Sequence, residues 1–247
     1  MKNSVIYNQR SKWSREFSLD ITPAQLSGVD ELLGRASRPM EYGSLNPSEL
    51  DSMEPSIIGL IDSSDLQIKY ALKENGLNIL INNAGILETN GASYENVNRQ
   101  SFLKTFDANT VGAIFTTKTF YPLLKKAAEN GDRAIVANIS SGLGSSTNVT
   151  SRFALSHTGQ EGDNYNIVYG MSKAAMNHFT KIFGSEEAKN GIIAVAFCPG
   201  WVQTDMGGQS AHLSVDESVG QLIKAIRNLK IEDSGRYIDR FGKTIPY

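Results

Sequence analysis

The chain has 247 residues and a mass of 27.0 kDa, with 40% hydrophobic residues, 20% charged residues and a formal net charge of -2. This composition excludes a disordered or collagen-like chain, and we expect residues 1–247 to form one domain. A pI near 6.0 offers no basic surface for nucleic acid. No segment reaches the ~18 apolar residues of a membrane span, and the first residues lack the apolar core of a signal peptide. We therefore expect a cytoplasmic protein without nucleic-acid or membrane partners.

The cysteine and histidine content excludes further kinds of site. Cys198 is the only cysteine, so neither an internal disulfide nor a cysteine-based zinc site forms. His157, His178 and His212 show no spacing typical of metal ligands. We expect no metal site.

Apolar runs alternate with amphipathic segments from about residue 48 to the end. The predicted strands are continuous apolar or β-branched runs, typical of strands buried on both faces, at 56–61, 77–81, 133–139, 192–197 and 235–239. The predicted helices lie at 64–74, 100–128, 164–189 and 215–228. This alternation predicts an α/β fold with a doubly wound, Rossmann-like parallel sheet. The segment before residue 48, where the first strand and helix of such a fold are expected, does not show this alternation.

The strand at 77–81 runs into the polar sequence Asn82-Asn83-Ala84-Gly85. Ligands of open α/β sheets bind at the carboxyl ends of the strands, which makes this junction a candidate site. The alternative is an ordinary turn after a strand, since asparagine and glycine favour turns.

Tyr169 and Lys173 are four residues apart on a predicted helix and so share one face. A cation beside a phenol favours the phenolate, and Lys173 is therefore expected to lower the pKa of Tyr169 toward that of a working general acid. Taken alone, the pair is more typical of a solvated helix surface than of a catalytic site.

Five motifs occur in an order that resembles the short-chain dehydrogenase/reductase family. They are Asn-Asn-Ala-Gly, the mid-helix Asn109, Ser140-Ser141-x-x-Gly, Tyr-x-x-x-Lys and the Pro-Gly-Trp-Val-Gln-Thr sequence at 199–204. The sequences around Ser141 and after Cys198 are similar to those of sniffer-type or C-factor-like carbonyl reductases. The resemblance covers residues 48–247 and implies reduction of a small aldehyde or ketone with a nicotinamide cofactor.

The resemblance implies catalytic roles for four residues. Tyr169 donates a proton to the carbonyl oxygen, and Ser141, preferred to Ser140, forms a hydrogen bond with that oxygen. Lys173 also holds the nicotinamide ribose, and Asn109 keeps a water in line with Lys173. For Asn109 the alternative is a polar residue inside a helix without a catalytic role.

Cofactor contacts are also implied by the resemblance. Asp62 is expected at the adenine edge, although it is equally suited to cap the next helix. Asn83 is expected near the adenosine ribose. The remaining expected contacts come from the turns after two strands and are Ala84, Gly85, Pro199, Gly200, Val202 and Thr204.

The resemblance favours NADPH over NADH and a homodimer formed through the helices at 100–128 and 164–189. Ser141 and Tyr169 lie farther apart than in compact members of the family, which implies an inserted loop at 145–164. Because this loop adjoins the expected active site, it is a candidate substrate lid, and the alternative is an inert surface loop.

The N-terminal segment departs from the family. The expected Thr-Gly-x-x-x-Gly-x-Gly loop, which lets backbone amides approach the cofactor pyrophosphate, is absent, and bulky or charged residues follow Val5 and Ile6. We hypothesise that residues from about Tyr7 to the mid-forties, within the atypical segment 1–47, are read out of frame. Reverse translation of 7–16 with one base removed gives a near match that lacks only the first glycine. The alternative function is therefore an inactive dehydrogenase-like protein that binds cofactor weakly.

Overall fold

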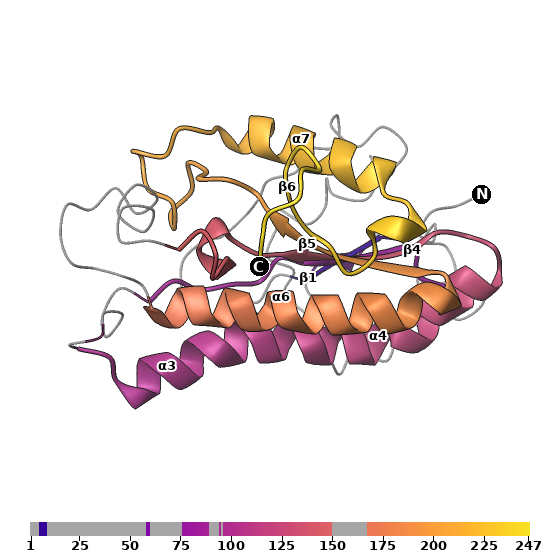
Figure 1. Cartoon of the computed structure of the whole chain (residues 1–247), viewed down its shortest axis with the longest axis horizontal. Coiled ribbons are helices and arrows are strands. Elements are labelled where there is room, and N and C mark those ends of the chain that lie inside the picture. Colours follow the sequence, from indigo (N-terminus) through magenta and orange to yellow (C-terminus); the bar gives the residue numbers. More distant parts are fainter. Residues whose placement is uncertain (1–4, 9–57, 60–75, 89–93, 95, 150–166) are drawn as a thin grey trace, which may run out of the picture.

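The computed structural model describes residues 5–8, 58–59, 76–88, 94, 96–149 and 167–247 (Figure 1). The strands are β1 (Val5–Asn8), β2 (Ile58–Gly59), β3 (Ile79–Asn82), β4 (Ala134–Ile139), β5 (Ile192–Cys198) and β6 (Tyr237–Asp239). The longer helices are α3 (Arg99–Phe106), α4 (Gly112–Glu129), α6 (Ile167–Glu187) and α7 (Val215–Asn228). Shorter helical turns are η2 (Asp107–Val111), η3 (Gly142–Gly144), η4 (Ala188–Asn190) and η5 (Ile231–Asp233).

All six strands form one parallel sheet in the order β2-β1-β3-β4-β5-β6. The chain passes from β1 outward to β2 and then returns to place β3 on the other side of β1, so the strand order reverses between β1 and β3. Such a reversal opens a crevice at the carboxyl ends of the strands. The predicted doubly wound parallel fold is confirmed, whereas β1 was not among the predicted strands.

Helices cover both faces of the sheet, with α3, α4 and α6 on one side and α7 on the other (Figure 1). Alternate residues of β4 supply the two apolar layers, because successive side chains of a strand point to opposite faces. Val136 packs with Phe120 and Leu124 of α4. Ile135 packs in the second layer, which includes Leu222 of α7. All six residues of β4 are buried, as the continuous apolar run predicted.

The observed helices match the predicted ones closely. The predicted helix at 100–128 is divided into α3, the π-helical η2 and α4. The helix predicted at 164–189 is present as α6 followed by η4. The helix predicted at 215–228 is confirmed at both ends as α7. Its start is fixed by the predicted capping box of Ser214 and Glu217.

Two glycines meet backbone requirements in and after α6. Gly191 adopts a left-handed φ of 78° after η4, as expected for the end of a helix. A Cβ at Gly184 would lie 2.4 Å from the backbone nitrogen of Gly235. The segment that leads into β6 therefore packs directly against the backbone of α6.

Several predictions lie outside the described residues. They concern the helix at 64–74, Asp62, most of the inserted loop at 145–164 and the atypical segment apart from β1. Within the part of the chain that the structure describes, no helix is both long and apolar enough to cross a membrane.

Candidate active site

The carboxyl ends of β3, β4 and β5 bring together the polar residues predicted from the sequence. Asn83, Ala84 and Gly85 follow β3, Ser141 follows β4, and Pro199 begins the turn after β5. Tyr169 and Lys173 come from the first turns of α6, which packs against η3 and β5. Of the predicted site residues, Asp62 alone lies outside the described ranges.

Tyr169 is buried, with 8% of its surface exposed. Burial raises the pKa of Tyr169 well above its ordinary value, because the phenolate would lose its hydration, and a hydrogen bond with the Ser141 side chain lowers the pKa by a smaller amount. This net direction is opposite to the one expected from Lys173 alone. The raised pKa favours the neutral, protonated phenol at neutral pH.

Lys173 is also buried, with 3% of its surface exposed. Burial lowers the pKa of Lys173 from 10.5 to about 8, because the ammonium group is desolvated. Its Nζ donates a hydrogen bond to the carbonyl oxygen of Ile139 over 2.8 Å and lies 5.6 Å from the centre of the Tyr169 ring. The lysine and the tyrosine therefore lie on one face of α6, as their spacing predicted.

The two adjacent serines after β4 point to different partners. Ser140 Oγ donates a hydrogen bond to Asn177 Oδ1 over 2.6 Å and is 2% exposed. Ser141 Oγ accepts a hydrogen bond from the Leu143 backbone N–H over 3.2 Å and also interacts with Tyr169. The Ser141 hydroxyl thus lies beside the phenol, whereas the Ser140 hydroxyl is bonded to Asn177, and the catalytic role of Ser141 stays a prediction.

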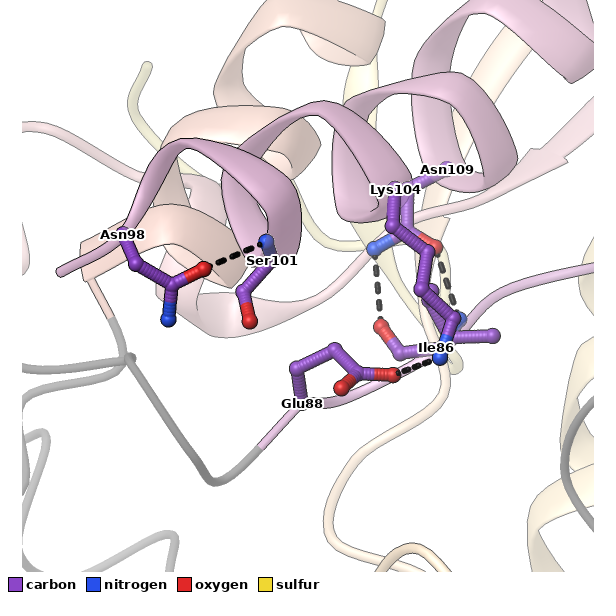
Figure 2. Close-up of polar contacts among 6 residues, drawn as sticks. All are labelled: Ile86, Glu88, Asn98, Ser101, Lys104 and Asn109. Carbon is purple, nitrogen blue, oxygen red and sulfur yellow. Dashed lines mark hydrogen bonds and ion pairs between the residues drawn. The ribbon is translucent and has the colours of Figure 1, made fainter.

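Asn109 lies in the π-helical turn η2 and is fully buried. Its side chain forms a two-point clamp on the backbone of Ile86 (Figure 2): Oδ1 accepts from the Ile86 N–H over 2.7 Å, and Nδ2 donates to the Ile86 carbonyl over 3.0 Å. Nδ2 also donates to Ser172 Oγ over 3.0 Å. Both amide hydrogens are thus engaged with the protein, so the side chain fixes the segment after β3 to α6.

Gly85 lies next to this clamp and to the lysine. A Cβ at Gly85 would be 3.4 Å from both Asn109 Oδ1 and Lys173 Nζ. The backbone after β3 therefore runs past the lysine without an intervening side chain. A bare backbone and a buried ammonium group at this edge fit the nicotinamide-ribose end of a cofactor.

An ion pair holds α3 near the same segment, and a side-chain cap fixes the start of the helix (Figure 2). Lys104 Nζ pairs with Glu88 Oε1 over 2.5 Å, and Asn98 Oδ1 caps the helix by accepting from the Ser101 N–H over 2.9 Å. The ion pair is partly exposed and therefore contributes little stability. Its effect is to orient the chain that leads away from Gly85.

The loop after β5 is folded on itself. Gly200 has a φ of 85°, a conformation that glycine adopts readily. Val202 is buried and pairs with Leu213, while Thr204 Oγ1 accepts from the Gly207 N–H over 3.1 Å. Trp201 Nε1 donates to the Gly207 carbonyl over 2.7 Å. Pro199, Gly200, Val202 and Thr204 thus lie in one folded loop, although Thr204 is engaged within it.

Sequence reasoning missed Tyr237 and assigned no role to Cys198, although negative charge on Cys198 raises the pKa of Tyr169, and negative charge on Tyr169 raises the pKa of Tyr237. Burial raises the pKa of Cys198, while hydrogen bonds from the backbone of Gly200 and Gly142 lower it. The position of Cys198 at a strand end is a signal that could have been used. Tyr237 offers no such signal in the sequence.

Within the described residues, no group of three or more histidine, cysteine, aspartate or glutamate side chains is arranged to hold a metal ion. The polar groups that converge here are instead a phenol, a hydroxyl and an amine. They are suited to proton transfer at an oxygen atom of a small molecule.

Residues 66–239, more than half of the chain, match the family described as enoyl-(acyl carrier protein) reductase. The C-signal protein of Myxococcus xanthus is 32% identical over 171 residues, which cover 69% of this chain and 93% of that protein. The chain belongs to the short-chain dehydrogenase/reductase family. This short-chain dehydrogenase/reductase is also 31% identical over 189 residues to the short-chain dehydrogenase anuI of Penicillium roqueforti, covering 73% of this chain and 70% of that protein.

Solved structures place the fold of this short-chain dehydrogenase/reductase near carbonyl reductases. The carbonyl reductase Sniffer of D. melanogaster aligns with a TM-score of 0.73 at 29% identity, covering 100% of both chains. The NADPH-bound carbonyl reductase from chicken fatty liver aligns with a TM-score of 0.71 at 28% identity, also over 100% of both chains. The similarity to sniffer-type carbonyl reductases predicted from the motifs is confirmed.

Proposed function

We propose that this oxidoreductase reduces a small aldehyde or ketone to an alcohol with NADPH as the hydride donor. One observation carries the proposal: the Tyr169 phenol lies against the Ser141 hydroxyl while Lys173 Nζ lies 5.6 Å from its ring centre. A proton donor, a second hydroxyl and a cation thus surround one position at the carboxyl edge of the sheet. This is the arrangement needed to protonate a carbonyl oxygen.

Three side chains have distinct roles in the proposed reaction. Tyr169 donates its proton to the carbonyl oxygen, and Ser141 donates a hydrogen bond to the same oxygen as negative charge develops there. NADPH supplies the hydride that reaches the carbonyl carbon. Lys173 stabilises the phenolate that Tyr169 becomes, because an opposite charge favours the ionised form.

The described residues also suggest how the cofactor is held. Lys173, with the bare backbone of Gly85 beside it, would hold the nicotinamide ribose, and Asn83 would contact the adenosine ribose, with Ala84 between them. The loop after β5 adds Pro199, Gly200, Val202 and Thr204, and Asp62 completes the expected set at the adenine edge. Asn109 acts by clamping Ile86, which keeps Gly85 against Lys173.

The preference for NADPH and the homodimer rest on separate observations. The carbonyl reductase from chicken fatty liver is bound to NADPH.

Exposed apolar side chains project from the helical layer formed by α3, η2, α4 and α6, and a partner subunit would cover them. They are Leu103, Val111, Phe115, Met171 and Ile182.

A second candidate function is an inactive relative that binds cofactor weakly. It is favoured by the residues that follow β1, where Gln9 and Arg10 stand in place of glycines that admit the pyrophosphate. If the segment is read out of frame, a chain with the corrected frame should bind NADPH more tightly than the chain described here. A continuous frame in the transcript would remove that explanation.

The deciding experiment is a fluorescence titration of the purified chain with NADPH and with NADH, together with a carbonyl-reduction assay. Tyr169→Phe is the control, since it removes the proton donor and keeps the ring. Micromolar NADPH binding, with reduction falling roughly 100-fold or more in Tyr169→Phe, supports the reductase. Absence of binding at millimolar cofactor would favour the inactive relative.

A further inference from the structure

Tyr237 of β6 is completely buried. Its hydroxyl donates a hydrogen bond to the backbone carbonyl of Ser141 over 2.5 Å, a contact between residues far apart in the sequence. Burial raises the pKa of Tyr237, so the hydroxyl remains protonated and able to donate. The residue that carries the reactive hydroxyl is therefore tied by its backbone to the edge strand of the sheet.

Asn177 of α6 joins the same contact. Its side chain forms a hydrogen bond with the Tyr237 hydroxyl, and its Oδ1 accepts from Ser140 Oγ over 2.6 Å. Asn177 Nδ2 also donates to the Gly144 carbonyl over 3.2 Å. The segment from Ser140 to Gly144 is thus held by one helix and one strand through buried hydrogen bonds, which are stronger where water is excluded.

We propose that Tyr237 is a positioning residue that holds Ser141 against Tyr169 through the Ser141 carbonyl group. The inference rests on the proposed reductase function for its catalytic consequence. Tyr237 itself does not touch the reacting atoms. It acts on the distance between the Ser141 hydroxyl and the substrate oxygen, where a small displacement weakens stabilisation of the transition state.

Tyr247 provides a matched control. Its ring lies 5.8 Å from the Tyr237 ring, and its hydroxyl donates to the Gly235 carbonyl over 2.7 Å. Tyr247→Phe removes a hydrogen bond of the same chemical kind from the same part of the fold without touching Ser141. Tyr237→Phe keeps the ring in the core and removes only the hydroxyl.

The first readout is the division of the effect between kcat and KM. We expect Tyr237→Phe to lower kcat roughly tenfold with little change in the KM for NADPH, and Tyr247→Phe to leave both unchanged. Equal effects of the two substitutions, or an effect on KM alone, would overturn the proposal. So would loss of cooperative unfolding in Tyr237→Phe, because the hydroxyl would then serve stability.

The second readout needs no cofactor and uses Cys198, the only cysteine of the chain. The Cys198 thiol receives a hydrogen bond from the Gly142 backbone, next to Ser141, and this bond lowers its pKa. We expect the pH midpoint of Cys198 alkylation by iodoacetamide to rise by roughly 0.5 in Tyr237→Phe and to stay constant in Tyr247→Phe. An unchanged midpoint in both variants would contradict the proposed anchoring of the loop.

The two readouts separate the two proposals. If the unmodified chain reduces no carbonyl compound but the alkylation midpoint still moves in Tyr237→Phe alone, the reductase function fails and the anchoring of Ser141 stands. If the chain is active and neither readout distinguishes the variants, the function stands and the role of Tyr237 is wrong.

Discussion

Lys173 Nζ donates a hydrogen bond over 2.8 Å to the carbonyl oxygen of Ile139, which fastens α6 to the last residue of β4. The same lysine is almost completely buried, and its lowered pKa of about 8 means that the folded chain releases this proton more easily than the unfolded chain. Between pH 8 and pH 10.5 the unfolded chain therefore binds more protons at this site. The contribution of Lys173 to the free energy of unfolding therefore rises with pH over that interval.

The first prediction concerns this pH dependence. Between pH 8 and pH 10.5, the free energy of unfolding of the unmodified chain should gain on that of Lys173→Met by an amount on the order of 3 kcal/mol. Urea unfolding of both proteins at pH 7.5 and at pH 10.5 measures it. The tyrosines and Cys198 titrate in both proteins, so their contributions to the pH dependence cancel when the two proteins are compared. Parallel pH profiles would show that the ammonium group of Lys173 is not desolvated.

A second prediction concerns the clamp made by Asn109. Asn109→Ala leaves the Ile86 N–H and carbonyl without their partner and should lower the free energy of unfolding by about 3 kcal/mol. Asn98→Ala is the control, because this exposed asparagine makes a single capping hydrogen bond with the Ser101 N–H, and its loss should cost about 1 kcal/mol. Chemical denaturation gives both values. Similar losses in the two variants would remove the special role of the clamp.

The bare backbone at Gly85 leads to a third prediction. Gly85→Ala should weaken NADPH binding about tenfold while the chain remains folded, because the added methyl group enters the space beside Lys173 Nζ. Gly220→Ala, in α7 with no atom within 4 Å of the added carbon, should leave binding unchanged. Fluorescence titration with NADPH compares them. If Gly85→Ala binds as tightly as Gly220→Ala, the cofactor does not approach this turn.

A fourth prediction tests the proposed homodimer. Phe115 of α4 and Phe241 after β6 are each 55% exposed, but only Phe115 belongs to the apolar helical layer. Phe115→Asp should therefore weaken self-association by about tenfold or more, and Phe241→Asp should not. Sedimentation equilibrium of both variants measures the effect. A monomeric parent protein would contradict the homodimer directly.

Much of the fold was predictable because its signals are local. The start of α7 was recognised from the Ser214 and Glu217 capping box, and the strand ending at Ile139 from its continuous apolar run. β1 was missed, because Val5–Asn8 is short and is not followed by the glycines that usually mark the first strand of this fold. Its pairing with β2 and β3 reveals it.

The candidate site was predictable only to the extent that its residues lie in recognisable motifs. The spacing of Tyr169 and Lys173 indicated a shared helix face, and the structure brings Ser141 beside the pair. The direction of the Tyr169 pKa was wrong, because desolvation depends on everything that surrounds a side chain. The contact between Tyr237 and Ser141 joins a strand to a distant loop, and no spacing rule in a single sequence predicts it.

The loop after β5 has a consequence for engineering. Trp201, Gln203 and Leu213 satisfy their hydrogen bonds within the loop, through Gly207, Ala211 and the paired backbone. Such a loop carries its own conformation and depends on the sheet chiefly at its two ends. It is therefore a natural unit to exchange between relatives, because the chain around the proposed site could change while Tyr169 and Lys173 of α6 remain where they are.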